Sequence, residues 1–441
     1  MMMLSHLQLK QIILDQRRTY PALMQAITRS EFAHISQFIP GSQVLIITGI
    51  RRCGKSTLMQ QIRQTQDEQD FYLSFEDERL VPFTLENFQA LLEVFIELYG
   101  VQKKFYFDEI QNIPGWERFI RRLHDQGNKI YITGSNANLL SKELGTRLTG
   151  RYIAIELYPY SFYEYCVAKK HKIKDTNLLD TASRALRKKW LNEYQKEGGF
   201  PEYLENEKTE YLTMLYESII YRDIINRYHI PNERPIKELV LFLSSNIGKM
   251  MSYGSLKNTL SLASGTTVAE YCHYLENCYM FFLVHRYDLS VKRQLLAPKK
   301  CYVIDTAMAQ ILGFRSSEDK GRFLENMVFI ELKRRNAGDI FYHQGKNECD
   351  FVLQQGITVT HAIQVTQTLH EKATKEREYA GLLEAMQTYQ LTSGLILTEN
   401  ENYEDAMVVN NKTVTIKVQP LWEWLLLSDT SKPTKKMIGG E

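Results

Sequence analysis

Residues 43–57 read QVLIITGIRRCGKST, an apolar run followed by a basic segment bounded by two glycines. The first part is short, uninterrupted and rich in β-branched residues, which is typical of a buried strand in a parallel sheet. The part from Gly49 to Thr57 matches the phosphate-binding loop motif G-x-x-x-x-G-K-[ST]. That motif needs a strand before it and a helix after it, so this segment predicts the first strand, loop and helix of an α/β domain.

The loop carries the residues that binding of a nucleoside triphosphate requires. Gly49 and Gly54 allow backbone conformations that turn successive N–H groups inward around an anion. The helix that begins at Lys55 adds the positive end of its dipole. Lys55 would reach the β- and γ-phosphates, and Ser56 would ligate Mg²⁺. We therefore expect ATP and Mg²⁺ to bind to Gly49, Ile50, Arg51, Arg52, Cys53, Gly54, Lys55, Ser56 and Thr57. The loop alone does not distinguish ATP from GTP.

Strand-like and helix-like segments alternate after the loop. We expect helices at residues 84–100 and 114–126, and strands at residues 70–77, 103–109, 128–135 and 151–157. Such alternation is typical of a parallel sheet that helices cover on both faces. The predicted fold class is therefore α/β, with the parallel sheet of a P-loop NTPase.

Two carboxylates end the strand at residues 103–109, which reads KKFYFDE. Ligands in parallel sheets bind at the carboxyl ends of the strands, and we expect this strand to neighbour the one that leads into the loop. Asp108 would then hold the Mg²⁺ shell, while Glu109 would orient and deprotonate an attacking water. In the next strand, ITGSN places Ser135 and Asn136 at the carboxyl end, where they could hold that water or the γ-phosphate. Capping of a following helix explains these two residues equally well.

Arginines near these motifs are candidates for stabilising charge on the γ-phosphate. Arg147 and Arg151 follow the strand at residues 128–135, and they could act in their own chain or from a neighbouring subunit. Arg51 and Arg52, inside the loop, are two further candidates. For each of the four, a solvated or structural ion pair is the alternative interpretation.

The middle of the chain predicts a winged helix-turn-helix, because three helices followed by a two-stranded ribbon form that motif. We expect the helices and then the strands at residues 236–247, 253–261, 266–278, 281–288 and 299–305. Lys292 and Arg293 would lie at the tip of the wing. A positive local charge balance makes DNA a candidate partner, but the third helix carries Glu270 and Glu276 and no Lys or Arg. Packing of the wing against protein is the alternative.

The last part of the chain predicts a second, smaller α/β domain. A helix with Glu325 precedes three strands, of which the second carries Asp350 and the third Gln364-Val365-Thr366. A metal-dependent nuclease of the PD-(D/E)xK, or restriction-endonuclease, type needs Glu-x-Lys at the last position, so that carboxylates hold Mg²⁺ and the lysine helps activate water. An amide and a hydroxyl cannot replace those groups. We therefore expect a PD-(D/E)xK-like fold without nuclease activity, in which Glu325 and Asp350 are structural.

The composition of the 441 residues excludes several classes of protein. Lys and Arg number 54 against 52 Asp and Glu, a net charge of +2, so the chain is not a polycation and any nucleic-acid surface must be local. The six cysteines form no CxxC pair, which disfavours a disulfide scaffold or a zinc ribbon. We find no signal peptide and no apolar run long enough to span a bilayer. We therefore expect a cytoplasmic protein with no membrane partner.

Several segments together resemble one family. They are GIRRCGKST, FYFDEIQN, ITGSN, LTGRY with LYPYSFYEY, GGFPEYL, YRDIINRY, FLENMVFIELKRR, NECDFVL, AIQVTQTL and KEREYAGLLEAM. Over nearly its whole length the chain is similar to a widespread set of prokaryotic AAA+-type P-loop ATPases with an uncharacterised, restriction-endonuclease-like C-terminal domain. The resemblance implies Mg²⁺-ATP binding at residues 49–57 with Asp108 and Glu109, a winged-helix middle and that C-terminal domain. Some relatives keep Glu-x-Lys where this chain has Gln364-x-Thr366.

These observations predict five regions and an enzymatic function. The regions are N-terminal helices with an AAA+-like ATPase core at 1–175, a helical connector at 176–232, a winged helix at 233–310, a restriction-endonuclease-like domain at 311–428 and a polar tail at 429–441. We predict a hydrolase that hydrolyses Mg²⁺-ATP and serves as a nucleotide-driven switch or remodeller, with a protein client or within a homo-oligomer. The alternative is an ATP-gated, DNA-associated regulator or defence component. An active metal-dependent nuclease ranks third.

Overall fold

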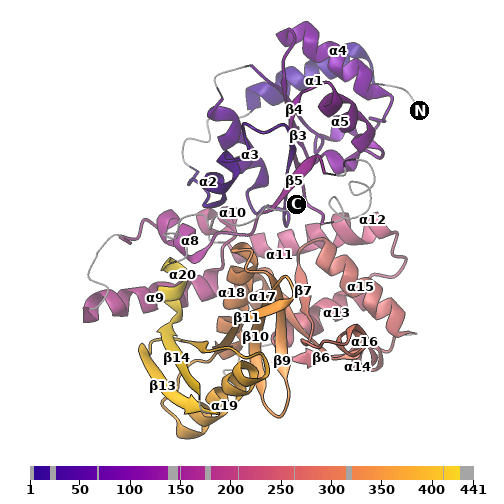
Figure 1. Ribbon diagram of the computed structural model, residues 1–441. Coiled ribbons are helices and arrows are strands. Elements are labelled where there is room, and N and C mark those ends of the chain that lie inside the picture. The colour runs from indigo at the N-terminus through magenta and orange to yellow at the C-terminus, as the bar shows by residue number, and fades with distance from the viewer. Residues whose placement is uncertain are drawn as a thin grey trace. The chain divides into compact units, whose positions relative to one another are not determined.

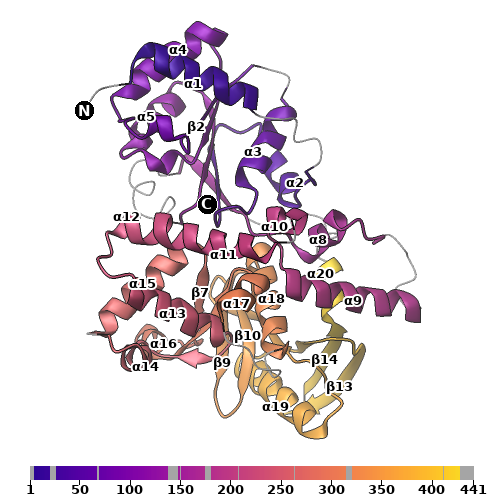
Figure 2. The same ribbon diagram turned by 180° about the vertical axis from the view of Figure 1, so that it is seen from behind.

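The computed structural model divides the chain into two compact units. It describes residues 4–19, 26–66, 69–137, 148, 150–173, 180–206, 208–262, 264–313, 320–410 and 412–427. The first unit, which we call the N-terminal unit, comprises Met1–Leu157 and Asn277–Tyr279. The second, the C-terminal unit, comprises Tyr158–Glu276 and Met280–Glu441. Figures 1 and 2 show both units from opposite sides. The predicted polar tail at 429–441 lies outside the described residues.

A five-stranded parallel sheet forms the centre of the N-terminal unit, as the sequence predicted. Its strands are β1 (Val44–Thr48), β2 (Phe71–Ser74), β3 (Lys104–Asp108), β4 (Lys129–Gly134) and β5 (Tyr152–Glu156). They lie in the order β2-β3-β4-β1-β5, and every pair is parallel. The expectation that the FYFDE strand neighbours the loop strand is wrong, because β4 lies between β3 and β1. The carboxyl end of β4 therefore lies between the strands that carry the two motifs.

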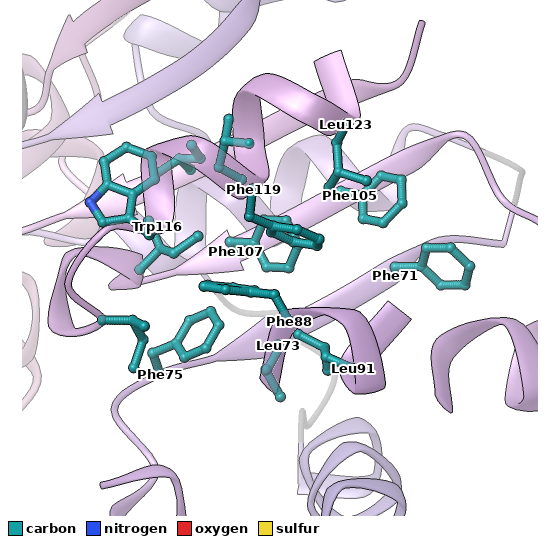
Figure 3. Close-up of a cluster of buried hydrophobic side chains, with 14 of the residues drawn as sticks. Phe71, Leu73, Phe75, Phe88, Leu91, Phe105, Phe107, Trp116, Phe119 and Leu123 are labelled. Carbon is teal, nitrogen blue, oxygen red and sulfur yellow. The ribbon is translucent and has the colours of Figure 1, made fainter. Parts of the chain in front are cut away.

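Helices pack on this sheet because alternate strand residues point to opposite faces. The helices are α1 (His6–Thr19), α2 (Glu31–Ser36), α3 (Lys55–Gln64), α4 (Asn87–Tyr99) and α5 (Trp116–Asp125), with short 3-10 turns at Glu78–Leu80 and Ile110–Asn112. Phe107 of β3 belongs to a buried cluster with α1, α4 and α5. In Figure 3 it lies beside Phe119, whose ring stacks on Phe88 with centroids 4.3 Å apart. Tyr106 faces the opposite way and stacks on Tyr131, with centroids 4.5 Å apart.

The C-terminal unit begins with helices. They are α8 (Phe162–Ala168), α9 (Thr181–Glu197), α10 (Pro201–Asn206), α11 (Thr209–Ser218), a π-helix at Ile219–Ile225 and α12 (Asn226–Tyr228). The GGFPEYL segment joins α9 to α10, and its backbone packs closely against the backbone of Tyr160. A Cβ on Gly199 would lie 2.3 Å from the carbonyl oxygen of Tyr160, so no side chain fits there. The Gly199 N–H donates to Asp305 Oδ2 at 2.7 Å.

A three-stranded antiparallel sheet follows, and it corrects one expectation. The elements are α13 (Arg234–Ser245), β6 (Met250–Met251), α14 (Tyr253–Thr259), α15 (Gly265–Asn277), β7 (Phe281–Val284), α16 (Val291–Leu296) and β8 (Lys299–Val303), with strand order β6-β8-β7. The sequence predicted two strands with Lys292 and Arg293 at a hairpin tip. The tip is instead the helix α16, because Val291, Leu295 and Leu296 recur at helical spacing. Arg293 Nη2 pairs there with Asp288 at 3.0 Å.

The rest of the C-terminal unit is a six-stranded mixed sheet with helices. The elements are α17 (Thr306–Leu312), α18 (Lys320–Arg334), β9 (Asp339–Gln344), β10 (Glu348–Gln355), β11 (Thr358–Val365), α19 (Lys372–Thr388), β12 (Ser393–Thr398), β13 (Tyr403–Val409), β14 (Lys412–Pro420) and α20 (Leu421–Leu427). The strand order is β13-β14-β12-β11-β10-β9, with β12 parallel to both β11 and β14. The sequence did not predict β13, an edge strand with alternating exposed residues. Within the described residues, every helix is too short or too polar to cross a bilayer.

Candidate nucleotide-binding site

The loop after β1 has the backbone conformations that the glycine motif predicts. Gly49, at φ +148°, allows no side chain, because a Cβ would lie 2.1 Å from the carbonyl oxygen of Leu157. Gly54 caps α3 in the left-handed region at φ +100°. Arg52 also has a positive φ, of 66°, which is strained for a residue with a side chain. Backbone strain of this kind is frequent in ligand-binding loops.

Lys55 and Glu109 form a buried ion pair at the end of the loop. Lys55 Nζ lies 3.3 Å from Glu109 Oε1, and the side chains are 4% and 7% exposed. Lys55 Nζ also donates to the carbonyl oxygen of Ile50 at 3.1 Å. Burial opposes both charges, but the pairing outweighs it: Glu109 raises the pKa of Lys55, and Lys55 with Arg51 lowers the pKa of Glu109. Both groups are therefore charged at neutral pH.

Hydroxyl groups surround Asp108, the other carboxylate of this strand end. Ser56 Oγ donates to Asp108 Oδ1 at 2.9 Å, and Thr133 Oγ1 of β4 donates to the same oxygen. Ser74 Oγ of β2 donates to Oδ2 at 3.4 Å. Burial, reinforced by the charge of Glu109, raises the pKa of Asp108 to about 6 although Thr133 and Ser56 lower it. The carboxyl ends of three strands and the start of α3 thus meet at one carboxylate.

The end of β4 contributes a polar atom without a partner. Ser135 is 1% exposed, and among the described residues its Oγ has no hydrogen-bond partner. Its backbone N–H donates to Glu109 Oε2 at 3.2 Å, so Ser135 lies beside the acidic pair. A buried hydroxyl without a partner carries a desolvation cost, which a group bound beside the acidic pair would offset. Asn136 is also buried, but the helix that it was alternatively expected to cap falls outside the described residues.

Of the predicted arginines that the structure describes, Arg51 lies near the site, because its charge helps to lower the pKa of Glu109. Arg51 Nη1 pairs with Glu76 Oε1 at 2.5 Å, while Arg52 is exposed. Arg147 lies outside the described residues. Arg151 precedes β5, whose Tyr152 pairs with Val44 at the start of β1, so Arg151 is at the opposite end of the strands from the loop. Its guanidinium lies 3.4 Å from Asp125. This corrects the expectation that Arg151 acts in the site of its own chain.

Sequence reasoning missed residues from outside the two motifs. Arg29 is buried and donates from Nη1 to the carbonyl oxygen of Cys53 at 2.8 Å, which braces the loop. Tyr279 donates from its hydroxyl to Thr48 Oγ1, the last residue of β1, at 2.9 Å. The Ala137 N–H, just after β4, donates to the carbonyl oxygen of Asn277 at 2.8 Å. The sequence could not identify Arg29 and Tyr279 as part of the site, because neither residue lies in a recognisable motif.

The donors at this site fit a magnesium nucleotide. Mg²⁺ prefers hydroxyl and carboxylate oxygens, and Ser56 and Asp108 place one of each within hydrogen-bonding distance. Backbone N–H groups at the start of α3 and the ammonium of Lys55 suit phosphate oxygens. The unpartnered Ser135 hydroxyl adds a further donor. The arrangement can therefore accommodate an anion and a hard cation side by side.

Comparisons with known proteins agree with this geometry. An AAA domain model matches residues 41–166, and a model of a domain of unknown function (DUF8612) matches residues 188–318. The uncharacterized protein MJ1544 of Methanocaldococcus jannaschii is 35% identical over 400 residues, 87% of this chain and 88% of that protein. An uncharacterized protein of Haemophilus influenzae is 33% identical over 355 residues, 76% of this chain and 86% of that protein.

Among solved structures, the ORC1 protein of Aeropyrum pernix in complex with DNA is 13% identical and covers 66% of this chain and 94% of its own, at a TM-score of 0.33. A TM-score this low supports no inference. The sequence identity and coverage of the two uncharacterized relatives are high enough to support membership of one family. The chain therefore belongs to the family of MJ1544 and of the Haemophilus protein, and its N-terminal unit contains an AAA-type P-loop domain.

Proposed function

We propose that the N-terminal unit binds and hydrolyses Mg²⁺-ATP. The observation that supports this most directly is the meeting of Lys55, Ser56, Asp108 and Glu109 at the carboxyl ends of the strands. The hydroxyl of Ser135, buried and without a partner beside them, is the atom that a ligand would satisfy.

Each residue has a definite part in this proposal. Ser56 and Asp108 would hold Mg²⁺, which when bound neutralises charge on the phosphates. Lys55 would leave Glu109 for the β- and γ-phosphates, so that the carboxylate becomes free to accept a proton from water. Ser135 would orient that water or the γ-phosphate. An arginine for the transition state would come from Arg147 or from Arg151 of a neighbouring subunit.

We further propose that nucleotide state is transmitted through residues 277–279. This short segment makes its contacts within the N-terminal unit, although the chain before and after it belongs to the C-terminal unit. It is bonded to the ends of two strands that border the nucleotide site, at Thr48 and at Ala137. Tyr279 has a positive φ of 62°, a conformation that its buried surroundings must enforce. A shift at either strand end would therefore reach the end of α15, which is the property of a nucleotide-driven switch.

The region from α13 to β8 fits a winged helix, and its surface favours a protein partner over DNA. The order helix, strand, two helices and two strands supports the motif. The third helix, α15, exposes Glu270 and carries no Lys or Arg, which is unsuited to phosphates. The wing instead exposes four large apolar side chains, between 59% and 89% exposed: Leu289, Val291, Leu295 and Leu296. Several exposed apolar side chains on one short segment suit a protein contact better than a phosphate-binding surface.

The sheet beyond α18 supports a restriction-endonuclease-like fold without the nuclease reaction. The order α18, β9, β10, β11, α19 and β12 agrees with the order of elements expected from the sequence. The structure adds that β11 is parallel to β12. Gln364 and Thr366 stand where the reaction needs a carboxylate and a lysine. We place the protein in the cytoplasm, since its six cysteines are all free and buried.

Nucleotide binding and phosphate release by the purified full chain test this proposal. We expect the wild type to bind and hydrolyse Mg²⁺-ATP, and Lys55→Ala to lose binding, whereas Lys103→Ala, at an exposed position outside the site, should keep both. Adding DNA at low and at moderate salt should leave the rate unchanged, and the mass in solution would establish whether a second subunit is available. Binding by Lys55→Ala equal to that of the wild type would refute the site.

A further inference from the structure

A buried lysine in the C-terminal unit has no part in the proposed ATPase. Lys300 lies on β8 with its side chain 1% exposed. Its Nζ is 2.9 Å from Glu325 Oε1, 2.9 Å from Asp350 Oδ1 and 2.5 Å from Glu348 Oε1. The three carboxylates come from α18 and from two positions on β10. The ammonium group of Lys300 is therefore surrounded by carboxylate oxygens from two different elements, α18 and β10.

Three carboxylates around one ammonium leave an excess of negative charge, which a pKa shift and hydrogen bonds reduce. Burial, reinforced by the charge of Asp350, raises the pKa of Glu325 to about 7. Burial opposes the charge on Lys300, but the carboxylates outweigh it and raise its pKa well above the usual value. Tyr302 donates from its hydroxyl to Glu325 Oε1 at 2.6 Å, and the Val365 N–H donates to Asp350 Oδ2 at 2.9 Å. A buried charge is tolerated only when it is paired and hydrogen-bonded in this way.

The arrangement is that of a cation site, with an ammonium as the cation. Carboxylates from several elements around one point are what hard divalent cations prefer, at roughly 2.0–2.6 Å from each oxygen. The neighbouring Gln364 does not reach toward this point as a ligand. Its Oε1 accepts from the Asp350 N–H at 3.2 Å and its Nε2 donates to Glu378. With Lys300 in place, the described residues contain no group of three or more His, Cys, Asp or Glu that could hold a metal ion, so these carboxylates would have to move closer together to bind one.

We propose that Lys300 is a built-in cation that takes the place of a metal ion between α18 and β10. The chain thereby holds its own carboxylates together at any metal concentration, and it excludes a catalytic metal from them. This inference is independent of the ATPase, because none of its residues belongs to the nucleotide site.

Neighbouring contacts indicate that the junction survives loss of this charge. Asn326 forms two hydrogen bonds with the backbone of Val303, at 2.8 and 2.9 Å. The ring of Tyr302 stacks on Phe329 with centroids 4.5 Å apart. These contacts fix β8 to α18 just after Lys300, at Tyr302 and Val303. A Lys300→Met variant keeps the apolar stem of the side chain, so it removes the charge with little change in packing.

The experiment is a Mn²⁺ titration of the nucleotide-free full chain, with thermal midpoints measured in EDTA and in Mn²⁺. We expect Lys300→Met to have a lower midpoint in EDTA, to recover part of it in Mn²⁺, and to bind one more Mn²⁺ per chain than the wild type. The control is Lys346→Met, at an exposed lysine between β9 and β10, which should match the wild type. No additional Mn²⁺ in folded Lys300→Met would overturn the proposal.

Two further measurements keep the proposal testable if Lys300→Met does not fold. The double variant Lys300→Met with Glu325→Gln removes a negative charge together with the positive one, and it should bind Mn²⁺ through Asp350 and Glu348. Adding Asp350→Asn to it should abolish that binding. The second measurement compares Mn²⁺ binding by the wild type and by Asp350→Asn, both of which keep Lys300. If the wild type binds a Mn²⁺ that Asp350→Asn does not, Lys300 does not exclude metal and the idea is wrong.

Discussion

Replacing Glu109 by Gln separates nucleotide binding from hydrolysis, and the structure predicts that the two change in opposite directions. The Lys55–Glu109 pair, at 3.3 Å, must be broken before Lys55 can contact phosphates. At an effective dielectric constant of about 20, the attraction across that distance is about 5 kcal/mol. Desolvation offsets most of it, and we take about 1–2 kcal/mol as the net cost of breaking the pair. Glu109→Gln should therefore bind Mg²⁺-ATP roughly 5- to 30-fold more tightly.

Hydrolysis should fall in the same variant, because an amide cannot accept the proton of the attacking water. A positioned general base contributes on the order of 10²–10⁴ in rate, so we expect turnover to decrease by at least about 100-fold. Binding is measured by calorimetry with Mg²⁺-ATP, and turnover by phosphate release. Glu78→Gln, the same change at an exposed position of the N-terminal unit, is the control and should match the wild type. Wild-type turnover in Glu109→Gln, or weaker binding, would refute this assignment.

Three further variants test the loop, the switch and a buried acid. Gly49→Ala places a Cβ 2.1 Å from the carbonyl oxygen of Leu157, so nucleotide binding should be lost and the thermal midpoint lowered. Tyr279→Phe removes the hydrogen bond to Thr48, at a cost of about 0.5–1.5 kcal/mol. The affinity for ATP should stay within about threefold of the wild-type value. The change in hydrogen exchange that ATP causes at residues 265–284 should become smaller. Asp305 has its pKa raised to about 6, chiefly by burial, so folding favours its protonated form and its contribution to stability increases as the pH falls through 6 toward 4. Between pH 7.5 and 5, Asp305→Asn should remove about 1.4 kcal/mol of that pH dependence, measured from thermal midpoints at those two pH values.

The sequence predicted the N-terminal unit well because its motifs are local. The apolar run, two glycines and Lys55-Ser56 are contiguous, so backbone and side chains that act together are adjacent in the chain. The order of the strands was not predictable in this way. Thr133 contacts Asp108 only because β4 lies between β3 and β1, and strand order depends on long-range packing rather than on any residue of the motifs.

The C-terminal unit shows where sequence reasoning fails. The wing was predicted as a hairpin because residues 289–298 are basic and lie between two strands, although the apolar positions of SVKRQLL recur at helical spacing. β13 was missed because an edge strand exposes alternate residues and needs few apolar ones. Lys300 carried one available signal, a charged residue within the apolar strand KKCYVID. Its partners lie 25 to 50 residues further along the chain, and no spacing rule connects them.

Two buried lysines in the same chain make opposite use of carboxylates. Lys55 has one carboxylate and one carbonyl oxygen as partners, and the phosphates of a nucleotide offer it more charge than it would give up. Lys300 is paired with three carboxylates. A ligand could draw its ammonium away only by offering more negative charge than these three groups together. The first lysine can therefore exchange partners during a reaction, and the second cannot. This difference in partner number, rather than the presence of acidic residues, supports our proposal that the nucleotide chemistry lies in the N-terminal unit.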